Sequence, residues 1–73
     1  MNKSIYSKDY KEIIDRLKRV RIEVGLAQQE VADILGKPQS YISKIESGER
    51  RLDVLEIKKF SHIYKKPIEY FLK

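Results

Sequence analysis

Short polar side chains near the middle of the chain have the types and spacing that suit hydrogen bonding to the edges of bases. The helix expected to begin at Pro38 turns Ile42 and Ile45 inward, which leaves an amide, two hydroxyls and an ammonium group on its outward face. These outward residues are Gln39, Ser40, Ser43 and Lys44, with Tyr41 at the flank. A Gln side chain pairs bidentately with adenine, and Lys donates to guanine O6 and N7. The pattern indicates base contacts in a DNA major groove.

Three further residues are placed to support such contacts. Gln28, at the start of the preceding helix, can bond a phosphate and orient Gln39, while Arg50 and Arg51 can reach a phosphate or a narrow minor groove. Simpler interpretations stand beside these: the two arginines are solvent-exposed charges, and the outward face is an ordinary solvated surface. Tyr41 either packs over the turn or touches a phosphate or a thymine methyl.

The sequence offers no comparable pattern for catalysis or metal binding. Ser40 and Ser43 have no base nearby that would activate them as nucleophiles. His62 is the single histidine and the chain has no cysteine, so we expect neither a metal site nor a disulfide. We expect no enzyme activity, no cofactor and no small-molecule substrate.

Length and composition set the class of protein. The 73 residues allow one domain, expected over 1–73 with a short N-terminal tail at about 1–7. A hydrophobic share of 41% supports a real core, and a formal charge of +5 suits a polyanionic partner. No apolar run resembles a signal peptide or a membrane span, so we expect a cytoplasmic protein that does not bind membranes.

Apolar residues recur at helical spacing throughout, which predicts an all-α fold. The expected helices run from Ser7 or Asp9 to Val24, from Gln28 to Leu35, from Pro38 toward Gly48, from Asp53 past Ile63, and briefly from Pro67. Their expected buried residues are Ile13, Ile14, Leu17, Val20, Val24, Val31, Ala32, Leu35, Ile42, Ile45, Val54 or Leu55, Ile57, Phe60, Ile63, Ile68, Phe71 and Leu72. Glu49 to Leu52 is expected to form a charged turn.

Helix boundaries carry recognisable signals. Gly25 and Gly36 supply left-handed stops, and Asp53 with Glu56 fits a capping box. Ala27 is a poor N-cap for the helix that follows it. Two short helices joined at Gly36, at roughly 28–46, form the arrangement in which a second helix can be presented to a groove.

The middle of the chain resembles the Cro and lambda-repressor type of helix-turn-helix, an XRE-like family of small phage and bacterial regulators. The resemblance covers roughly 17–72 and rests on an ordered set: Gly25, Leu26, Gln28, Glu30, Val31, Ala32, Gly36, Ile42, Ser43, Ile45, Glu46 and Gly48. It implies a compact five-helix fold, a third helix in the major groove of double-stranded DNA and a homodimer on an inverted repeat. The family's DNA-contacting places correspond to Gln28, Gln39, Ser40, Ser43 and Lys44.

The resemblance also implies a partly buried ion pair between Arg21 and Glu46. Ala27 departs from it, because the family usually has Ser or Thr there, and the missing cap costs roughly 1 kcal/mol. We interpret the chain as a sequence-specific regulator, expected to be a repressor. The alternative is an antitoxin-like or adaptor module that uses the same fold to hold a protein.

The aromatic residues Tyr64, Tyr70 and Phe71 near the C-terminus leave one question open. They either complete the monomer core or, in part, pair two subunits.

Overall fold

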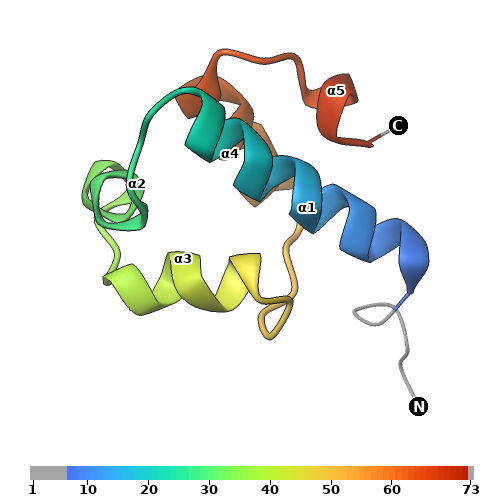
Figure 1. The fold of residues 1–73 in the computed structure, drawn as a ribbon, viewed down its shortest axis with the longest axis horizontal. Coiled ribbons are helices and arrows are strands. Elements are labelled where there is room, and N and C mark those ends of the chain that lie inside the picture. The colour runs from blue at the N-terminus through green and yellow to red at the C-terminus, as the bar shows by residue number, and fades with distance from the viewer. Residues whose placement is uncertain (1–6, 73) are drawn as a thin grey trace.

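Five α-helices and no strand make up residues 7–72, the part of the chain that the computed structural model describes (Figure 1). The all-α prediction is confirmed. The helices are α1 (Lys8–Glu23), α2 (Gln28–Leu35), α3 (Gln39–Glu46), α4 (Val54–Tyr64) and α5 (Ile68–Leu72). Of the expected N-terminal tail, residues 1–6 lie outside the described residues, and Ser7 is the N-cap of α1.

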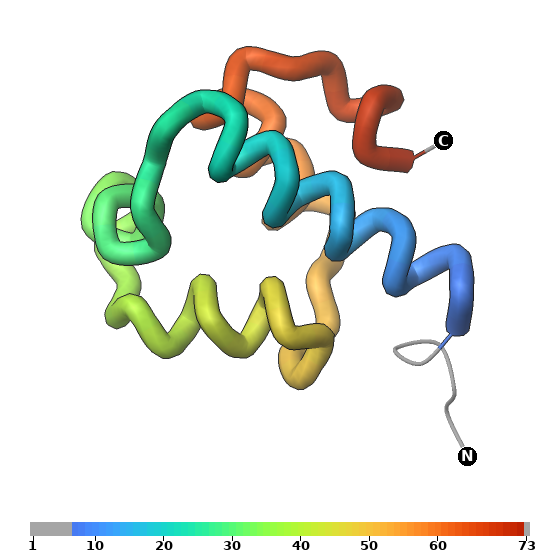
Figure 2. The backbone as a smooth tube through the Cα atoms, in the orientation of Figure 1, coloured from blue at the N-terminus to red at the C-terminus, as the bar shows by residue number. Residues whose placement is uncertain are grey.

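Helix α1 runs through the middle of the molecule, and the other four helices surround it. In the view of Figure 1, α2 and α3 lie at the left and lower edges, α4 passes behind α1, and α5 lies at the upper right. The tube in Figure 2 follows the same path and shows the short links between helices. Contacts join α2 to α3, and α1 to α3, α4 and α5. The third helix is therefore supported from inside by α1 and from the side by α2.

The predicted caps explain where three helices begin or end. The Ser7 hydroxyl accepts from the Tyr10 N–H at 3.1 Å, so it satisfies one unpaired donor of α1. At α4, Asp53 accepts from the Glu56 N–H at 2.9 Å and the Glu56 carboxylate accepts from the Asp53 N–H at 3.0 Å, which is a complete capping box. Gly36 ends α2 with φ +68°, a left-handed conformation that glycine adopts without a Cβ penalty.

The expectation that Pro38 is the first residue of α3 is wrong. Pro38 is the N-cap, with φ −71° and ψ 155°, and the helix begins at Gln39. The proline ring fixes φ near a value that helical and extended backbone share, so ψ alone decides between them. Here the extended ψ lets the Pro38 carbonyl accept from the Tyr41 N–H at 3.0 Å.

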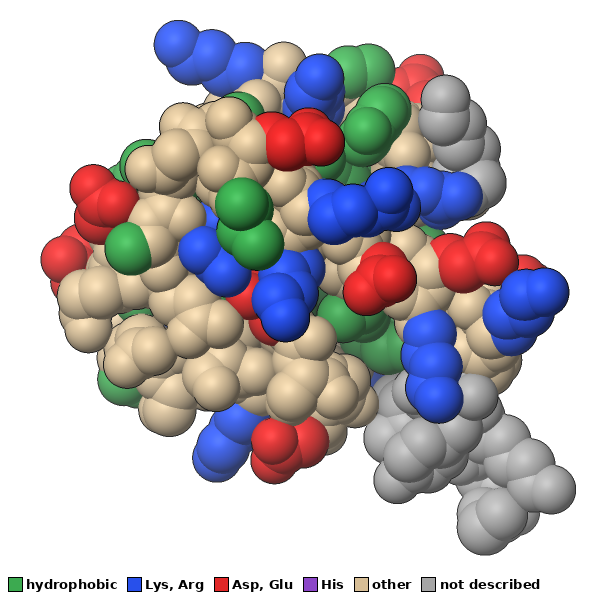
Figure 3. All heavy atoms as spheres, in the orientation of Figure 1, with side chains coloured by type: hydrophobic (Ala, Val, Ile, Leu, Met, Phe, Trp, Pro, Cys, Tyr) green, Lys and Arg blue, Asp and Glu red, His purple; other side chains and the backbone are tan. Residues whose placement is uncertain are grey.

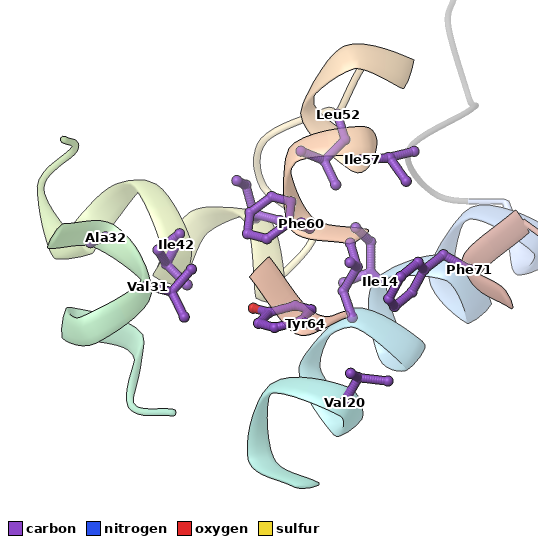
Figure 4. Close-up of a cluster of buried hydrophobic side chains, with 12 residues drawn as sticks. Ile14, Val20, Val31, Ala32, Ile42, Leu52, Ile57, Phe60, Tyr64 and Phe71 are labelled. Atoms are coloured by element: carbon purple, nitrogen blue, oxygen red, sulfur yellow. The ribbon is translucent and has the colours of Figure 1, made fainter. Parts of the chain in front are cut away.

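All five helices and one turn residue contribute to the buried core. Figure 4 shows these side chains converging, with Ile14 and Val20 from α1 facing Phe71 from α5. Ala32 is fully buried where α2 meets α3, so its small side chain permits their close approach. The core residues are Ile14, Leu17, Val20, Val31, Ala32, Ile42, Ile45, Leu52, Ile57, Phe60, Tyr64 and Phe71.

Three predictions of burial are wrong: Val24, the one apolar residue expected at Val54 or Leu55, and Leu72 are exposed instead. Val24 is the C-cap of α1, and its side chain is 43% exposed because the chain turns away there. Val54 and Leu55 are 60% and 66% exposed, so neither lies on the buried side of α4, and Leu72 is 46% exposed at the end of α5. A periodic pattern identifies one helix face, but at a helix end no neighbouring element covers that face.

Two of the three C-terminal aromatic residues belong to the core of the monomer. Tyr64 and Phe71 are buried in the monomer, with ring centroids 6.5 Å apart, while Tyr70 packs edge-on against Phe71. These rings complete the core of one chain.

Ala27 offers a direct test of the local energetics. It is the exposed N-cap of α2 with an extended backbone and no side-chain cap, although the Glu30 carboxylate accepts from its N–H at 2.7 Å. Ala27→Thr adds the missing acceptor, whereas Ala27→Val adds the same bulk without one. We expect the Thr variant to unfold with a free energy about 1 kcal/mol above that of the Val variant.

Urea denaturation of both variants measures this difference. In a domain of this size it corresponds to a melting temperature roughly 4–8 °C higher. Equal stability of the two variants would show that a side-chain acceptor at this N-cap contributes nothing to the start of α2.

Candidate nucleic-acid interface

Helices α2 and α3 form a unit joined by a tight turn, with one side of α3 left open. Lys37 donates its backbone N–H to the Ala32 carbonyl at 2.9 Å, which fixes the turn just after Gly36. Ile42 and Ile45 are almost completely buried beneath α3. The opposite face carries Gln39, Ser40, Ser43 and Lys44, all exposed. In Figure 3 the lower edge, where α3 lies, is mostly tan, which denotes backbone and uncharged polar side chains.

A bidentate ion pair joins α1 to the end of α3. Arg21 Nε lies 2.6 Å from Glu46 Oε2 and Arg21 Nη2 lies 3.0 Å from Glu46 Oε1. The two side chains are only 11% and 6% exposed. Hydrogen bonding to Glu46 raises the pKa of Arg21, despite the opposing effect of burial. A third guanidinium nitrogen, Nη1, donates to the Leu26 carbonyl at 2.8 Å and so fixes the loop before α2.

Two glutamine amides extend this ion pair to the surface. Gln28 Nε2 donates to Glu46 Oε1 at 2.9 Å, and Gln39 Nε2 donates to Gln28 Oε1 at 2.8 Å. Gln28 is half-buried and Gln39 is exposed. We call this series of Arg21, Glu46, Gln28 and Gln39 the amide relay. It places Gln28 where it can orient Gln39, the arrangement anticipated from the sequence.

Tyr41 packs over the turn that follows α3. Its hydroxyl donates a short hydrogen bond to the Glu56 carboxylate, and the Arg50 guanidinium lies 4.7 Å from its ring centroid. Burial and the bond to Glu56 raise the pKa of the Tyr41 phenol to about 12. These contacts favour the packing interpretation of Tyr41 over a DNA contact.

The two arginines of the turn differ in their engagement. Arg50 Nη1 donates to Glu56 Oε2 at 2.9 Å, although its side chain is still 43% exposed. Arg51 is exposed, and within residues 7–72 its side chain makes no hydrogen bond or ion pair. Of the two arginines, Arg51 is therefore the one whose guanidinium is available to bind a phosphate.

Tyr10 fixes the same turn from α1, a role that the sequence analysis missed. Its hydroxyl donates to the Arg50 carbonyl at 3.3 Å and accepts from the Leu52 N–H at 2.9 Å. This pairing explains why Leu52 is buried inside an otherwise charged turn. A signal was present, because Tyr10 falls one helical turn before Ile13 and Ile14 on the inward stripe of α1.

Other kinds of site have little support among residues 7–72. No three His, Cys, Asp or Glu side chains in that range gather as a metal site requires, and His62 lies exposed on α4. None of the helices described is long and apolar enough to cross a membrane.

Two short helices joined by a left-handed glycine, with a buried inner stripe and an open polar face on the second, define a helix-turn-helix DNA-binding domain. A family profile described as helix-turn-helix matches residues 17–71. The chain therefore belongs to the Cro-type, XRE-like helix-turn-helix family, a family of non-enzymatic DNA-binding regulators. A search of curated proteins finds no match to the chain.

Tyr41 makes the stability of the fold sensitive to alkaline pH. Because the folded-state pKa of its phenol, about 12, lies above the ordinary value of 10.0, the fold favours the protonated form. This contribution is complete below pH 10.0 and is lost as the pH rises through about 12. We expect the wild-type protein to lose more free energy of unfolding over this interval than Tyr41→Phe.

Urea denaturation at a series of pH values provides the comparison. The buried Tyr64 phenol, whose pKa is also raised by burial, is common to both proteins and cancels. If the free energies of unfolding of the two proteins changed in parallel with pH, the pKa of Tyr41 would be the same in the folded and unfolded states.

Proposed function

We propose that the protein is a cytoplasmic transcriptional repressor that binds an inverted-repeat DNA site as a homodimer and occludes a promoter. The observation that carries the proposal is the exposed polar face of α3, with Gln39 held in place by the amide relay. A helix of this width and polarity fits a major groove. Two copies of α3 would enter successive major grooves at half-sites about one helical turn apart.

Base selection and backbone positioning fall to different residues in this proposal. Gln39, Ser40 and Ser43 select bases, since amides and hydroxyls on the open face match base edges. Contacts to the DNA phosphates come from Lys44, from Gln28 and from the Arg50–Arg51 turn. Arg51 is the freer of the two arginines, because Arg50 donates to Glu56. Contacts to phosphates fix register without carrying sequence information.

Selection from a random pool of double-stranded DNA at near-physiological salt tests this function. We expect enrichment of an inverted repeat whose half-sites are about ten base pairs apart. Retention that depends on salt but yields no motif would contradict sequence-specific binding, because phosphate contacts alone produce that behaviour.

Two variants separate base reading from phosphate binding. Gln39→Ala should reduce the preference at one base-pair position by roughly 1–3 kcal/mol, because one bidentate contact is lost. Arg51→Ala, the control, should weaken binding to all sequences alike and lower the salt slope by about one. Repeating the selection and a salt titration for each variant gives both readouts. An unchanged motif with Gln39→Ala would remove that residue from base selection.

A separate surface favours a second candidate function, the holding of a protein partner. Helices α2 and α4 line an apolar groove of about 500 Å³. Ile34 and Leu55 are 60% and 66% exposed on its walls, so within residues 7–72 the groove presents a contiguous apolar surface, which is typical of an interaction site. The lining residues are Ile34, Leu35, Leu55, Lys58, Lys59, His62 and Ile63.

We propose that the occupant of this groove is an acidic amphipathic helix of another protein. An apolar stripe would cover the isoleucines and leucines, and its carboxylates would meet Lys58 and Lys59. A second copy of this chain suits the groove less well, because a two-fold contact would bring the same lysines face to face.

Selection from a displayed library of helical peptides tests the groove. Enriched peptides should combine Leu or Ile at helical spacing with Asp or Glu. The Leu55→Ser variant should bind these peptides about tenfold more weakly than the wild-type protein does. Val54→Ser is the matched control, since Val54 is 60% exposed in the same turn but does not line the groove. Peptides that bind Leu55→Ser as well as wild type, or that lack acidic residues, would exclude this occupant.

A further inference from the structure

One charged group determines the order of donors and acceptors along the whole amide relay. An ionised carboxylate only accepts hydrogen bonds, so the Gln28 atom that faces Glu46 must be the amide nitrogen, at 2.9 Å. The amide oxygen of Gln28 then faces Gln39. Since an oxygen there requires a donor, Gln39 directs its own nitrogen inward, at 2.8 Å.

The charge of Glu46 is itself held in place. Arg21 donates two hydrogen bonds to it, and both side chains are almost completely buried. Both oxygens of this carboxylate accept from guanidinium N–H groups, and Oε1 also accepts from the Gln28 amide nitrogen. The direction of the relay is therefore fixed from its buried end.

The surface end of the relay presents one remaining N–H beside one oxygen. Within residues 7–72, Gln39 Oε1 and the second hydrogen of its Nε2 make no hydrogen bond. Adenine offers an acceptor at N7 and a donor at N6 in the major groove, which matches this pair. Guanine offers two acceptors, O6 and N7, and the single free N–H can satisfy one of them while Oε1 opposes the other.

We propose that Glu46 is a positioning residue for base specificity: its buried charge orients Gln39, through Gln28, to accept adenine and disfavour guanine. This inference rests on the proposed function, and it predicts adenine at one position of the DNA site. Glu46 touches no base in this scheme. It acts by preventing the two amides from reversing, which would exchange the donor and acceptor at the surface.

Two substitutions interrupt the relay at different points. Glu46→Gln replaces the obligate acceptor with a group that can also donate, so both amides become free to reverse. It also leaves Arg21 unpaired and can prevent folding. Gln28→Met removes the intermediate amide and keeps the Arg21–Glu46 ion pair, so this variant tests the relay in a folded protein.

The measurement is the ratio of dissociation constants for two DNA duplexes with adenine or guanine at the position that loses its preference in Gln39→Ala. We expect each relay variant to reduce this ratio by at least about fivefold, the lower end of what one bidentate base contact contributes. Preferences at other positions and the salt slope should be unchanged. Loss of a merely structural contact would weaken both duplexes equally.

Glu49→Gln is the matched control, because Glu49 is exposed in the turn after α3 and bonds to Ser47 outside the relay. It removes the same charge near the DNA and should leave the ratio unchanged. A wild-type preference for adenine that persists in folded Gln28→Met and Glu46→Gln would overturn the positioning role alone. A wild-type protein without base preference at any position would overturn the proposed function together with it.

Discussion

The buried ion pair between Arg21 and Glu46 is the interaction on which the placement of α2 and α3 depends. It joins α1 to the end of α3, and the same guanidinium holds the loop before α2 through the Leu26 carbonyl. Replacing both charges with apolar groups need not destabilise a protein, but removing one leaves the other buried and costs about 3–5 kcal/mol. The pair therefore specifies an arrangement more than it adds stability, and this arrangement orients the polar face of α3.

A second set of contacts holds the turn that follows α3. The Tyr10 hydroxyl bridges the Arg50 carbonyl and the Leu52 N–H, while Glu56 accepts hydrogen bonds from both Tyr41 and Arg50. These contacts connect α1 and α4 to a turn that has no regular structure of its own. Helix α3 is thus held at its last residue by the ion pair of Glu46 and in its first turn by the bond from Tyr41 to Glu56, while its polar face stays exposed.

Local signals in the sequence predicted most of the fold. The features that the sequence did not predict depend on contacts between residues far apart in the chain. Glycines and capping residues located α2 and α4 because they act within one turn of the helix. The prediction that either Val54 or Leu55 is buried was wrong because burial depends on which element lies opposite. Tyr10 and Leu52 are 42 positions apart, and no periodicity relates them. The Arg21–Glu46 pair came from the family resemblance, whereas the link from Gln28 to Glu46 required the structure.

The distribution of charge explains why such a buried network suits a reading face. Of the four outward residues of α3, only Lys44 is charged, so the excess positive charge of the chain lies mainly elsewhere. Attraction to phosphates is independent of sequence and needs little orientation. A hydrogen bond from a neutral amide to a base contributes less binding free energy than a charged contact to a phosphate. The amide discriminates between bases only if the positions of its donor and its acceptor are fixed before binding. Fixing an exposed amide requires a rigid partner, and the nearest rigid charge in this fold is the carboxylate that Arg21 already holds.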